Sequence, residues 1–354
     1  MMSLYGGSQI QGQHMQPVPQ VRVSAYLPFI QYMERQGAAF QQEFGDTLLP
    51  AVAAKNVEAL VPIHLAHAFL ARCARSADAA DLGYVVGRAA TVEGLGAFGR
   101  SLLRSLTLHD ALGKVRSTFA LYSSAERLWW RRSLGNVEFL HTHLYETGPG
   151  SLYAQQCALF LMRDLVRLVA GPQWQPPAVL ITPRHDVAVT RHAFGTADVR
   201  VGEVCGIMFP VELLSLPFVR PLGGAATPER DLTAFEASAP ANDFVGSVKQ
   251  IIAALMAEGH THLNSIAEAL RLHSRTLQRK LSESEIEFSQ LLAEVRFVAA
   301  ARLLDDPRRR VIDVAFELGY ADSANFTRAF RQWTGVSPSD FRRLREKARC
   351  REMT

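Results

Sequence analysis

The segment Val314–Phe330, with the sequence VAFELGYADSANFTRAF, carries the pattern that decides the fold of the second half of the chain. The segment Ile266–Leu281, IAEALRLHSRTLQRKL, repeats this pattern earlier in the sequence. In each segment a short apolar helix ends in a tight turn. The helix that follows is apolar at positions i and i+4 and polar or basic between them. The sequence therefore predicts two helix-turn-helix units.

Small and turn-forming residues stand where the two helices of each unit meet. Ala267 and Ala315 occupy the positions at which one helix must cross closely over its partner. Gly319 follows the first helix of the second unit, where a positive φ is needed and glycine adopts it at little cost. The first unit has Arg271 at the equivalent position and a turn that is one residue shorter. Because residues other than glycine seldom adopt a positive φ, the geometry of this first turn is left open.

The second helix of each unit presents the residues that would contact a partner. We expect Ser274 to cap this helix in the first unit, and Asp322 or Ser323 to cap it in the second. Arginine and glutamine form paired hydrogen bonds with guanine and adenine edges in the major groove of DNA. The same side chains also occur on ordinary solvated helix faces, and it is their repetition in two units that favours DNA. The predicted DNA-binding residues are Ser274, Arg275, Thr276, Gln278, Arg279, Lys280, Ser323, Asn325, Thr327, Arg328 and Arg331.

These residues divide by the part of DNA that they would meet. Lys280 and Arg331 are expected on phosphates, which position the protein without reading sequence. The residues expected on base edges are Arg275, Gln278, Arg279, Ser323, Thr327 and Arg328.

Residues 243–345 resemble the DNA-binding domain of the AraC/XylS family of bacterial transcription regulators. The resemblance rests on the second unit together with Trp333–Pro338, WTGVSP, which match the signature of that family. It covers under a third of the chain. It implies an all-α domain that binds double-stranded DNA in the major groove, with RNA polymerase as a further partner.

A long helix is expected between the two units. Apolar residues recur every three or four positions from Phe288 to Leu303, and Asp306-Pro307 then ends the helix. About 17 residues span about 25 Å. Such a spacer would hold the two reading helices about 34 Å apart, which is one turn of B-DNA. Ser337–Asp340 then has the pattern of a capping box with proline at the first helical position.

The sequence divides into five parts by composition and pattern. We predict a disordered tail at 1–20, an effector-binding or dimerisation domain at 21–220, a linker rich in proline and glycine at 221–242, the DNA-binding domain at 243–345 and a basic tail at 346–354. The expected fold is an α+β domain followed by an all-α domain in which a long helix joins two helix-turn-helix units.

The first domain shows both helical and alternating patterns. An apolar series runs from Tyr26 through Phe40 to Phe44. The other predicted helices are Val61–Cys73, Thr107–Tyr122, Leu152–Leu168, Arg230–Glu236 in the linker, and Phe244–Ala257 at the start of the second domain. The predicted strands are Glu126–Trp130, Val137–Tyr145, Ala178–Thr182, Val187–Phe194 and Arg200–Phe209.

This domain is similar to the arabinose-binding-type N-terminal domain found in a subset of AraC/XylS regulators. The similarity rests on the order of Ile63–Leu70, Asp81–Gly99, Thr107–Leu112 and Arg191–Gly195. It implies a sensor for a small-molecule effector without identifying the molecule. The alternative is a domain that only forms a homodimer or binds a protein partner. An apolar cavity would favour the sensor, whereas a filled core with an exposed apolar face would favour the partner.

Two histidines in one predicted strand are candidate metal ligands. His141 and His143 alternate on the same face, with Glu146 nearby. Two histidines without a clear third ligand more often reflect packing or polar surface, so no metal is predicted. The glycines of 81–99 fit neither GxGxxG nor a P-loop, and helix termini and close packing explain them.

The cysteines argue against catalysis. Cys73, Cys157, Cys205 and Cys350 are scattered without CxxC or metal spacing, which suits reduced thiols in a cytosol. A rival hypothesis, a DNA-binding module fused to a repair methyltransferase, needs a cysteine activated by a metal or basic neighbours, and none is indicated. No Ser/His/Asp, Cys/His or paired-carboxylate arrangement appears, so neither an enzyme nor a cofactor is predicted.

The charge and hydropathy of the chain fit a cytoplasmic DNA-binding protein. The net charge is +4 and the isoelectric point is near 9.0. Residues 243–354 contain 18 Lys and Arg against 15 Asp and Glu, so most of the excess positive charge lies where DNA contact is predicted. No apolar run reaches the roughly 18–20 residues that a membrane helix needs, and no secretory signal is evident.

Overall fold

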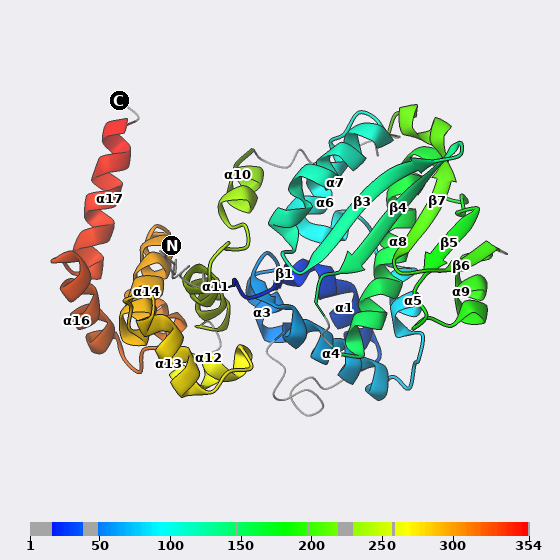
Figure 1. Ribbon diagram of the computed structural model, residues 1–354. Coiled ribbons are helices and arrows are strands. Elements are labelled where there is room, and N and C mark those ends of the chain that lie inside the picture. Colours follow the sequence, from blue (N-terminus) through cyan, green and yellow to red (C-terminus); the bar gives the residue numbers. More distant parts are fainter. Residues whose placement is uncertain are drawn as a thin grey trace, which may run out of the picture.

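A helix-covered sheet domain is followed by an all-helical domain in the computed structural model (Figure 1). The structure describes residues 16–37, 49–145, 148–196, 198–218, 229–256 and 259–352. Residues 1–15 of the predicted tail, Phe40, Phe44, Glu146 and residues 219–228, which include the start of the predicted linker, lie outside this set. None of the described helices is both long and apolar enough to span a lipid bilayer.

The larger sheet has five strands in the order β3-β4-β7-β5-β6. Their bounds are β3 (Glu126–Ser133), β4 (Asn136–His143), β5 (Ala178–Ile181), β6 (Asp198–Val201) and β7 (Cys205–Pro210). Neighbouring strands are antiparallel except for the parallel pair β5–β6. Leu134 and Gly135 join β3 to β4 with φ values of 45° and 79°, as a tight hairpin turn between right-twisted strands requires.

Helices cover this sheet. The bounds are α1 (Leu27–Arg35), α3 (Leu49–Lys55), α4 (Ile63–Ser76), α5 (Leu82–Gly87), α6 (Gly96–Leu103), α7 (Leu108–Tyr122), α8 (Gly150–Ala170) and α9 (Val187–Phe194). α8 packs against β4 and β7, and α7 packs against β3. The Thr107 side chain caps α7 by accepting a hydrogen bond from the Asp110 amide at 3.2 Å.

A second sheet pairs two short strands near the all-helical domain. β1 (Gln20–Arg22) is antiparallel to β2 (Leu60–Pro62). The linker helix α10 (Glu229–Ala237) leads on to α11 (Phe244–Met256). Both strands of this sheet are fully buried, because α11 packs against β2 from the second domain.

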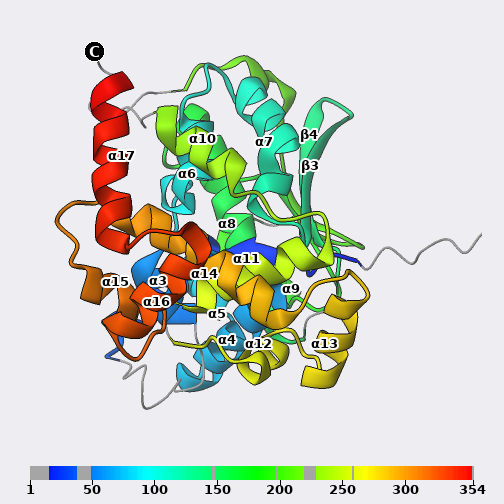
Figure 2. The same cartoon turned by 90° about the vertical axis from the view of Figure 1, so that its left-hand side faces the viewer.

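The all-helical domain has its two helix-turn-helix units on either side of one long helix (Figure 2). The units are α12 (Leu263–Ala269) with α13 (Ser274–Ser282), and α15 (Val311–Glu317) with α16 (Ser323–Thr334). α14 (Phe288–Leu304) lies between them, and α17 (Pro338–Glu352) follows. The apolar residues predicted at i and i+4 form the core: Leu277, Leu281, Phe326 and Phe330 are all inaccessible to solvent.

These observations confirm the predicted fold class, an α+β domain followed by an all-helical domain with two helix-turn-helix units. Residues 346–352 of the predicted tail continue α17 as helix. Ser337 forms the predicted capping contacts of that helix, accepting a hydrogen bond from the Asp340 amide and donating one to its carboxylate.

Two strand predictions were wrong. Val187–Phe194 forms helix α9 and not a strand, because the Asp186 side chain caps it at the Val189 amide and Gly195 ends it in the left-handed conformation. The predicted strand Arg200–Phe209 is two strands, β6 and β7, that are separated by a turn. There the Gly202 amide donates to the Ile181 carbonyl.

Two further predictions need correction. The predicted helix Val61–Cys73 starts at Ile63, because Leu60–Pro62 pairs with β1. Ser274 is not the cap of α13: His273 holds that position, and the Ser274 hydroxyl donates to the Asn264 side chain.

Candidate DNA-binding face and interior cavity

The two reading helices are exposed on opposite sides of α14 (Figure 2). Arg271 adopts a φ of 54° and Gly319 a φ of 76°, so both units turn through the left-handed region. The two turns are therefore alike in conformation although only the second contains glycine. Ala267 and Ala315 are buried where the helices of each unit meet.

On α13, the predicted base-reading residues Arg275, Gln278 and Arg279 are exposed. Arg279 forms an ion pair with Glu283 one turn further along at 2.7 Å, which is an exposed contact of small strength. The Lys280 ammonium lies 5.3 Å from the Phe244 ring centroid on α11, so its stem leans towards the protein. Ser274 and Thr276 are half-buried at the start of the helix.

On α16, Asn325, Arg328 and Arg331 are exposed, while Ser323 and Thr327 are half-buried. The Asp322 side chain caps the helix by accepting a hydrogen bond from the Asn325 amide. The Thr327 hydroxyl donates to the Ser323 carbonyl at 2.7 Å, so this proton is already engaged within the helix. The face thus offers two arginines and an amide to a ligand.

Other arginines of this domain hold the protein together. Arg342 donates to the carbonyls of Leu304 and Arg309, which ties α17 to the end of α14. Arg296 donates to the Leu318 carbonyl beside the second turn at 3.1 Å. The exposed arginines 308–310 lie between α14 and α15, where Arg309 pairs with Glu317 and Arg310 with Asp313.

The sheet domain encloses a cavity of about 90 Å³ between β3, β4 and helices α1, α6, α7 and α8. Its wall is mostly apolar and buried, and includes Phe98, Phe119 and Phe139. Glu126 and His141 form a polar end. Sequence reasoning did not identify these lining residues, since apolar core positions and cavity positions have the same pattern.

Glu126, His141 and His143 come together at this polar end. The Glu126 carboxylate oxygen Oε1 lies 3.2 Å from His141 Nε2 and 3.4 Å from His143 Nδ1. Burial alone would raise the pKa of Glu126, but the hydrogen bond from His141 and the neighbouring imidazoles lower it to about 2. Burial lowers the pKa of His143 to about 4, against the attraction of Glu126. Glu146, which follows these histidines closely in the sequence, lies outside the described residues.

The three buried thiols Cys73, Cys157 and Cys205 are unsuited to nucleophilic chemistry. Burial raises the pKa of Cys73 and of Cys157 to about 12, and that of Cys205 to about 11. The thiolate is the reactive form, so these side chains are inert near neutral pH.

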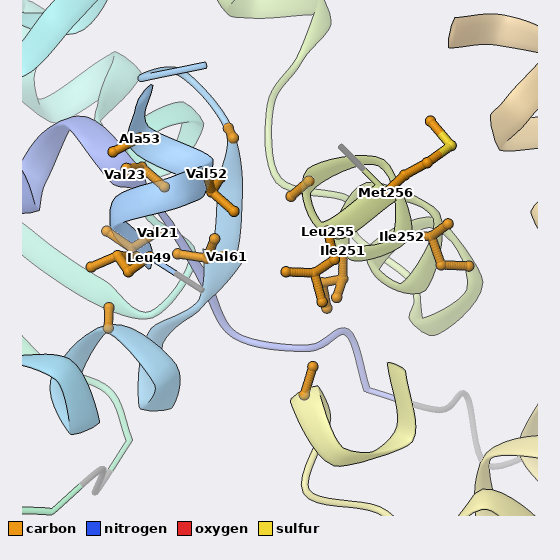
Figure 3. Close-up of a cluster of buried hydrophobic side chains, with 14 of the residues drawn as sticks. Val21, Val23, Leu49, Val52, Ala53, Val61, Ile251, Ile252, Leu255 and Met256 are labelled. Carbon is orange, nitrogen blue, oxygen red and sulfur yellow. The ribbon is translucent and has the colours of Figure 1, made fainter. Parts of the chain in front are cut away.

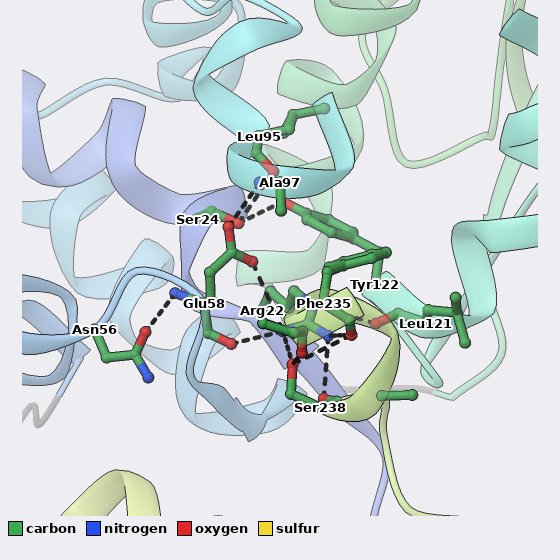
Figure 4. Close-up of polar contacts among 12 residues, drawn as sticks. Arg22, Ser24, Asn56, Glu58, Leu95, Ala97, Leu121, Tyr122, Phe235 and Ser238 are labelled. Carbon is green, nitrogen blue, oxygen red and sulfur yellow. Dashed lines mark hydrogen bonds and ion pairs between the residues drawn. The ribbon is translucent and has the colours of Figure 1, made fainter. Parts of the chain in front are cut away.

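A buried arginine holds the linker helix α10 against the sheet domain (Figure 4). Arg22 is inaccessible to solvent, and its Nη2 donates to the carbonyls of Phe235 at 2.9 Å and Ser238 at 3.0 Å, at the end of α10. Its Nη1 lies 3.7 Å from the Glu58 carboxylate. Burial lowers the pKa of Arg22, an effect that Glu58 opposes. The Phe235 ring also stacks near Phe98 of the cavity wall, with centroids 6.4 Å apart.

The two domains share one continuous apolar cluster (Figure 3). Val21 and Val61 of the small sheet face Ile251 and Leu255 of α11. The Val18 amide donates to the Ser247 hydroxyl of α11 at 3.1 Å. The two domains are therefore in direct contact as well as being joined through α10.

Comparison with known proteins matches both halves of the chain. The family model described as the arabinose-binding domain of AraC transcription regulator, N-term, matches residues 37–218, more than half of the chain. A helix-turn-helix domain model matches residues 266–344.

Relatives of similar length are transcription regulators. The ornithine utilization regulator of Pseudomonas aeruginosa is 27% identical, over 74% of this chain and 78% of its own. The HTH-type transcriptional regulator VirS of Mycobacterium tuberculosis is 27% identical, over 75% and 79%. The crystal structure of the transcriptional regulator CdpR from P. aeruginosa is 21% identical over 90% of this chain and 98% of its own, with a TM-score of 0.40.

Proposed function

Because this chain belongs to the AraC family of DNA-binding transcription regulators and is not an enzyme, we propose that it reads a specific DNA site with α13 and α16 under the control of a small molecule bound in the interior cavity. Base edges are contacted by Arg275, Gln278, Arg279, Ser323, Thr327 and Arg328. Phosphates are contacted by Lys280 and Arg331.

The exposed side chains of both helices support the DNA-reading part. Arg275 and Gln278 form no hydrogen bond or ion pair with other described residues, so both are available to a ligand without breaking a contact. Both types form paired hydrogen bonds with bases. Lys280, which packs on Phe244, keeps its charge near the surface and suits a phosphate.

The interior cavity supports the proposal that a bound small molecule controls DNA binding. It has the apolar wall expected of a small-molecule site, with a polar end at Glu126 and His141 that would orient a bound molecule. Its wall reaches α10 through Phe98 and Phe235. A molecule that binds one arrangement of this wall more tightly than another shifts the population of DNA-binding states. A domain that only dimerises or binds a protein partner is the alternative, and the cavity favours the sensor.

The DNA-reading part is tested by mixing the purified full chain with fragmented genomic DNA and sequencing the bound fragments at two salt concentrations. Discrete sites with two half-motifs about one turn apart are expected. Arg279→Ala should weaken binding by about 1–3 kcal/mol and relax specificity at one position. Arg116→Ala, which removes an exposed charge on α7, is the matched control. Diffuse, salt-labile binding without a motif would overturn the proposal.

The effector part is tested by screening small molecules for those that change the affinity of the chain for its DNA site. Ala158 lines the cavity, and Ala158→Leu fills part of it. Ala170→Leu changes α8 outside the cavity lining and serves as the control. A hit should act on wild type and the control and lose its effect in Ala158→Leu. Hits that act equally on all three proteins would place the effector elsewhere.

By family resemblance, we extend the proposal to contacts with RNA polymerase and with a second copy of the chain. Chemical crosslinking of the DNA-bound protein, with and without polymerase, tests both partners. Crosslinks confined to single chains would contradict this extension.

A further inference from the structure

Three side chains of metal-ligating type meet on one face of the β3–β4 hairpin. Glu126 pairs directly with His143 in the antiparallel register, and Leu128 pairs with His141. His141 and His143 are two residues apart, so they project from the same face of β4. All three side chains are at most 10% exposed. The hairpin therefore fixes a compact, nearly dry set of two imidazoles and one carboxylate.

The spacing of the ligand atoms suits a single ion. His141 Nε2 and His143 Nδ1 lie 3.2 and 3.4 Å from the same carboxylate oxygen, and all the ligand atoms are within 4.8 Å of one another. Two atoms bound to a tetrahedral zinc ion at about 2.0–2.1 Å are separated by about 3.4 Å. The two imidazole–carboxylate distances thus match that separation, and the ion would take the place of the proton that His141 Nε2 donates to Glu126.

The hydrogen bond of His143 shows which of its two ring nitrogens carries the free lone pair. Its Nε2 faces the Ser151 carbonyl at 3.3 Å, and a carbonyl only accepts, so Nε2 carries the proton. A neutral imidazole then has a lone pair on Nδ1, which points at the Glu126 oxygen and has no hydrogen-bond donor. Two lone pairs facing each other in a buried place are unfavourable, and a cation between them would remove the repulsion.

The surroundings of His143 supply the outer partner that a metal-binding histidine needs. The Ser151 carbonyl holds the outer nitrogen of His143, as outer-shell carbonyls do for histidine ligands. Arg184 donates to the Ser151 hydroxyl at 2.8 Å, which steadies this segment. The His67 ring packs edge-on against His143 with centroids 4.8 Å apart. His143 is therefore fixed in orientation from two sides.

We propose that Glu126, His141 and His143 bind one divalent transition-metal ion of the zinc class, with its fourth position open to the interior cavity. Two imidazoles with one carboxylate suit zinc, cobalt or nickel, and not calcium or magnesium, which prefer oxygen ligands. Glu126 and His141 line the cavity, so a molecule in it can reach the ion. This site goes beyond effector control and stands without it, because the ion is held by protein side chains alone.

The test uses the full chain, without an affinity tag and stripped by a chelator, titrated with Co²⁺. A tetrahedral Co²⁺ site gives strong visible absorption bands, which we expect to saturate at one equivalent and to vanish on addition of Zn²⁺. His143→Ala and Glu126→Gln should each weaken Co²⁺ binding about tenfold or more. His192→Ala removes an exposed histidine of α9 and should bind as wild type does.

Circular dichroism of each variant shows whether it is folded, so loss of the metal site can be told from loss of the fold. Whether the chain binds Co²⁺ at all is decided on wild type, without any substitution. Absence of saturable Co²⁺ absorption in folded wild type would overturn the proposal. So would binding that both folded variants retain, because the ion would then lie elsewhere. Neither readout involves DNA or an effector, so failure here is distinguishable from failure of the proposed regulation.

Discussion

Arg271 and Gly319 occupy equivalent turn positions with very different side chains. Both follow the first helix of a helix-turn-helix unit, and both have φ in the left-handed region, at 54° and 76°. Only glycine does so without a clash between Cβ and the backbone. The first turn is therefore strained where the second is not, and a hydrogen bond from the Leu272 amide to the Ala267 carbonyl closes it at 2.9 Å.

This comparison makes a prediction of opposite sign at the two positions. Gly319→Ala should lower the free energy of unfolding by about 1–2 kcal/mol, since it forces a Cβ into the left-handed region. Arg271→Gly should raise it by up to about 1 kcal/mol, because relief of strain exceeds the added freedom of the unfolded chain. Urea denaturation of both variants measures the changes. Equal signs would contradict the claim that the two turns share a conformation.

A buried histidine away from the cavity predicts how the sheet domain responds to acid. Burial lowers the pKa of His185 from 6.5 to about 4, although the backbone hydrogen bond with Thr182 opposes the shift. Between these values the unfolded chain binds a proton that the folded chain does not. Stability contributed by neutral His185 is therefore complete above about pH 6.5 and lost as the pH falls towards 4.

Melting temperatures between pH 7 and 4 test this prediction. The wild-type melting temperature should fall across this window. His185→Asn should reduce this fall, because it removes a pH-dependent contribution to the unfolding free energy of roughly 3 kcal/mol at most. The exposed-site variant His192→Ala should keep the wild-type slope. A His185→Asn profile parallel to wild type would show that this imidazole does not contribute.

The end of helix α10 is held by the guanidinium group of Arg22. Arg22 contributes Nη2 to two carbonyls there, Nε to the Leu121 carbonyl and Nη1 to the Glu58 carbonyl. Arg22→Lys keeps the charge but cannot reproduce this planar set of donors. We expect a loss of about 2–3 kcal/mol in unfolding free energy, from carbonyls left without donors.

Limited proteolysis gives a local readout of the same substitution. Cleavage within or beside α10 should become faster in Arg22→Lys, while cleavage elsewhere stays as in wild type. Arg100→Lys, on α6, controls for the exchange of arginine by lysine. An unchanged cleavage pattern together with unchanged stability would show that α10 is held by Phe235 packing alone.

The elements also show where sequence reasoning succeeded and where it could not. The helix-turn-helix units were predictable because apolar residues such as Phe326 and Phe330 recur with the period of the helix that buries them. Val187–Phe194 has alternating β-branched residues typical of a strand, but it forms a helix that is capped by the Asp186 side chain. The contact of Glu126 with His141 could not be predicted from the sequence, because it depends on the register of the hairpin, which brings together residues 15 positions apart. The cavity depends on packing of several elements and leaves no local pattern.

Helices α13 and α16 belong to one packed unit built on α14. Arg296 of α14 bonds the turn of the second unit, and the Phe297 ring lies 6.2 Å from those of Phe330 and Trp333. α11, which contacts the sheet domain, packs against the same helix. Arg296 also donates to the Thr261 hydroxyl, just before the first unit, at 3.3 Å. The spacing of α13 and α16 is consequently set by packing around α14 within a single chain.

This packing predicts how binding depends on the spacing of the two half-motifs in DNA. Inserting 5 base pairs turns one half-motif to the far side of the duplex, and inserting 10 restores the side but adds about 34 Å. Because α14 cannot lengthen, both insertions should reduce affinity to that of a single half-motif, a loss of about 100-fold or more. Replacing the spacer by an unrelated sequence of equal length should retain binding. Recovery of affinity with the 10-base-pair insertion would show instead that two separate chains, flexibly joined, each read one half-motif.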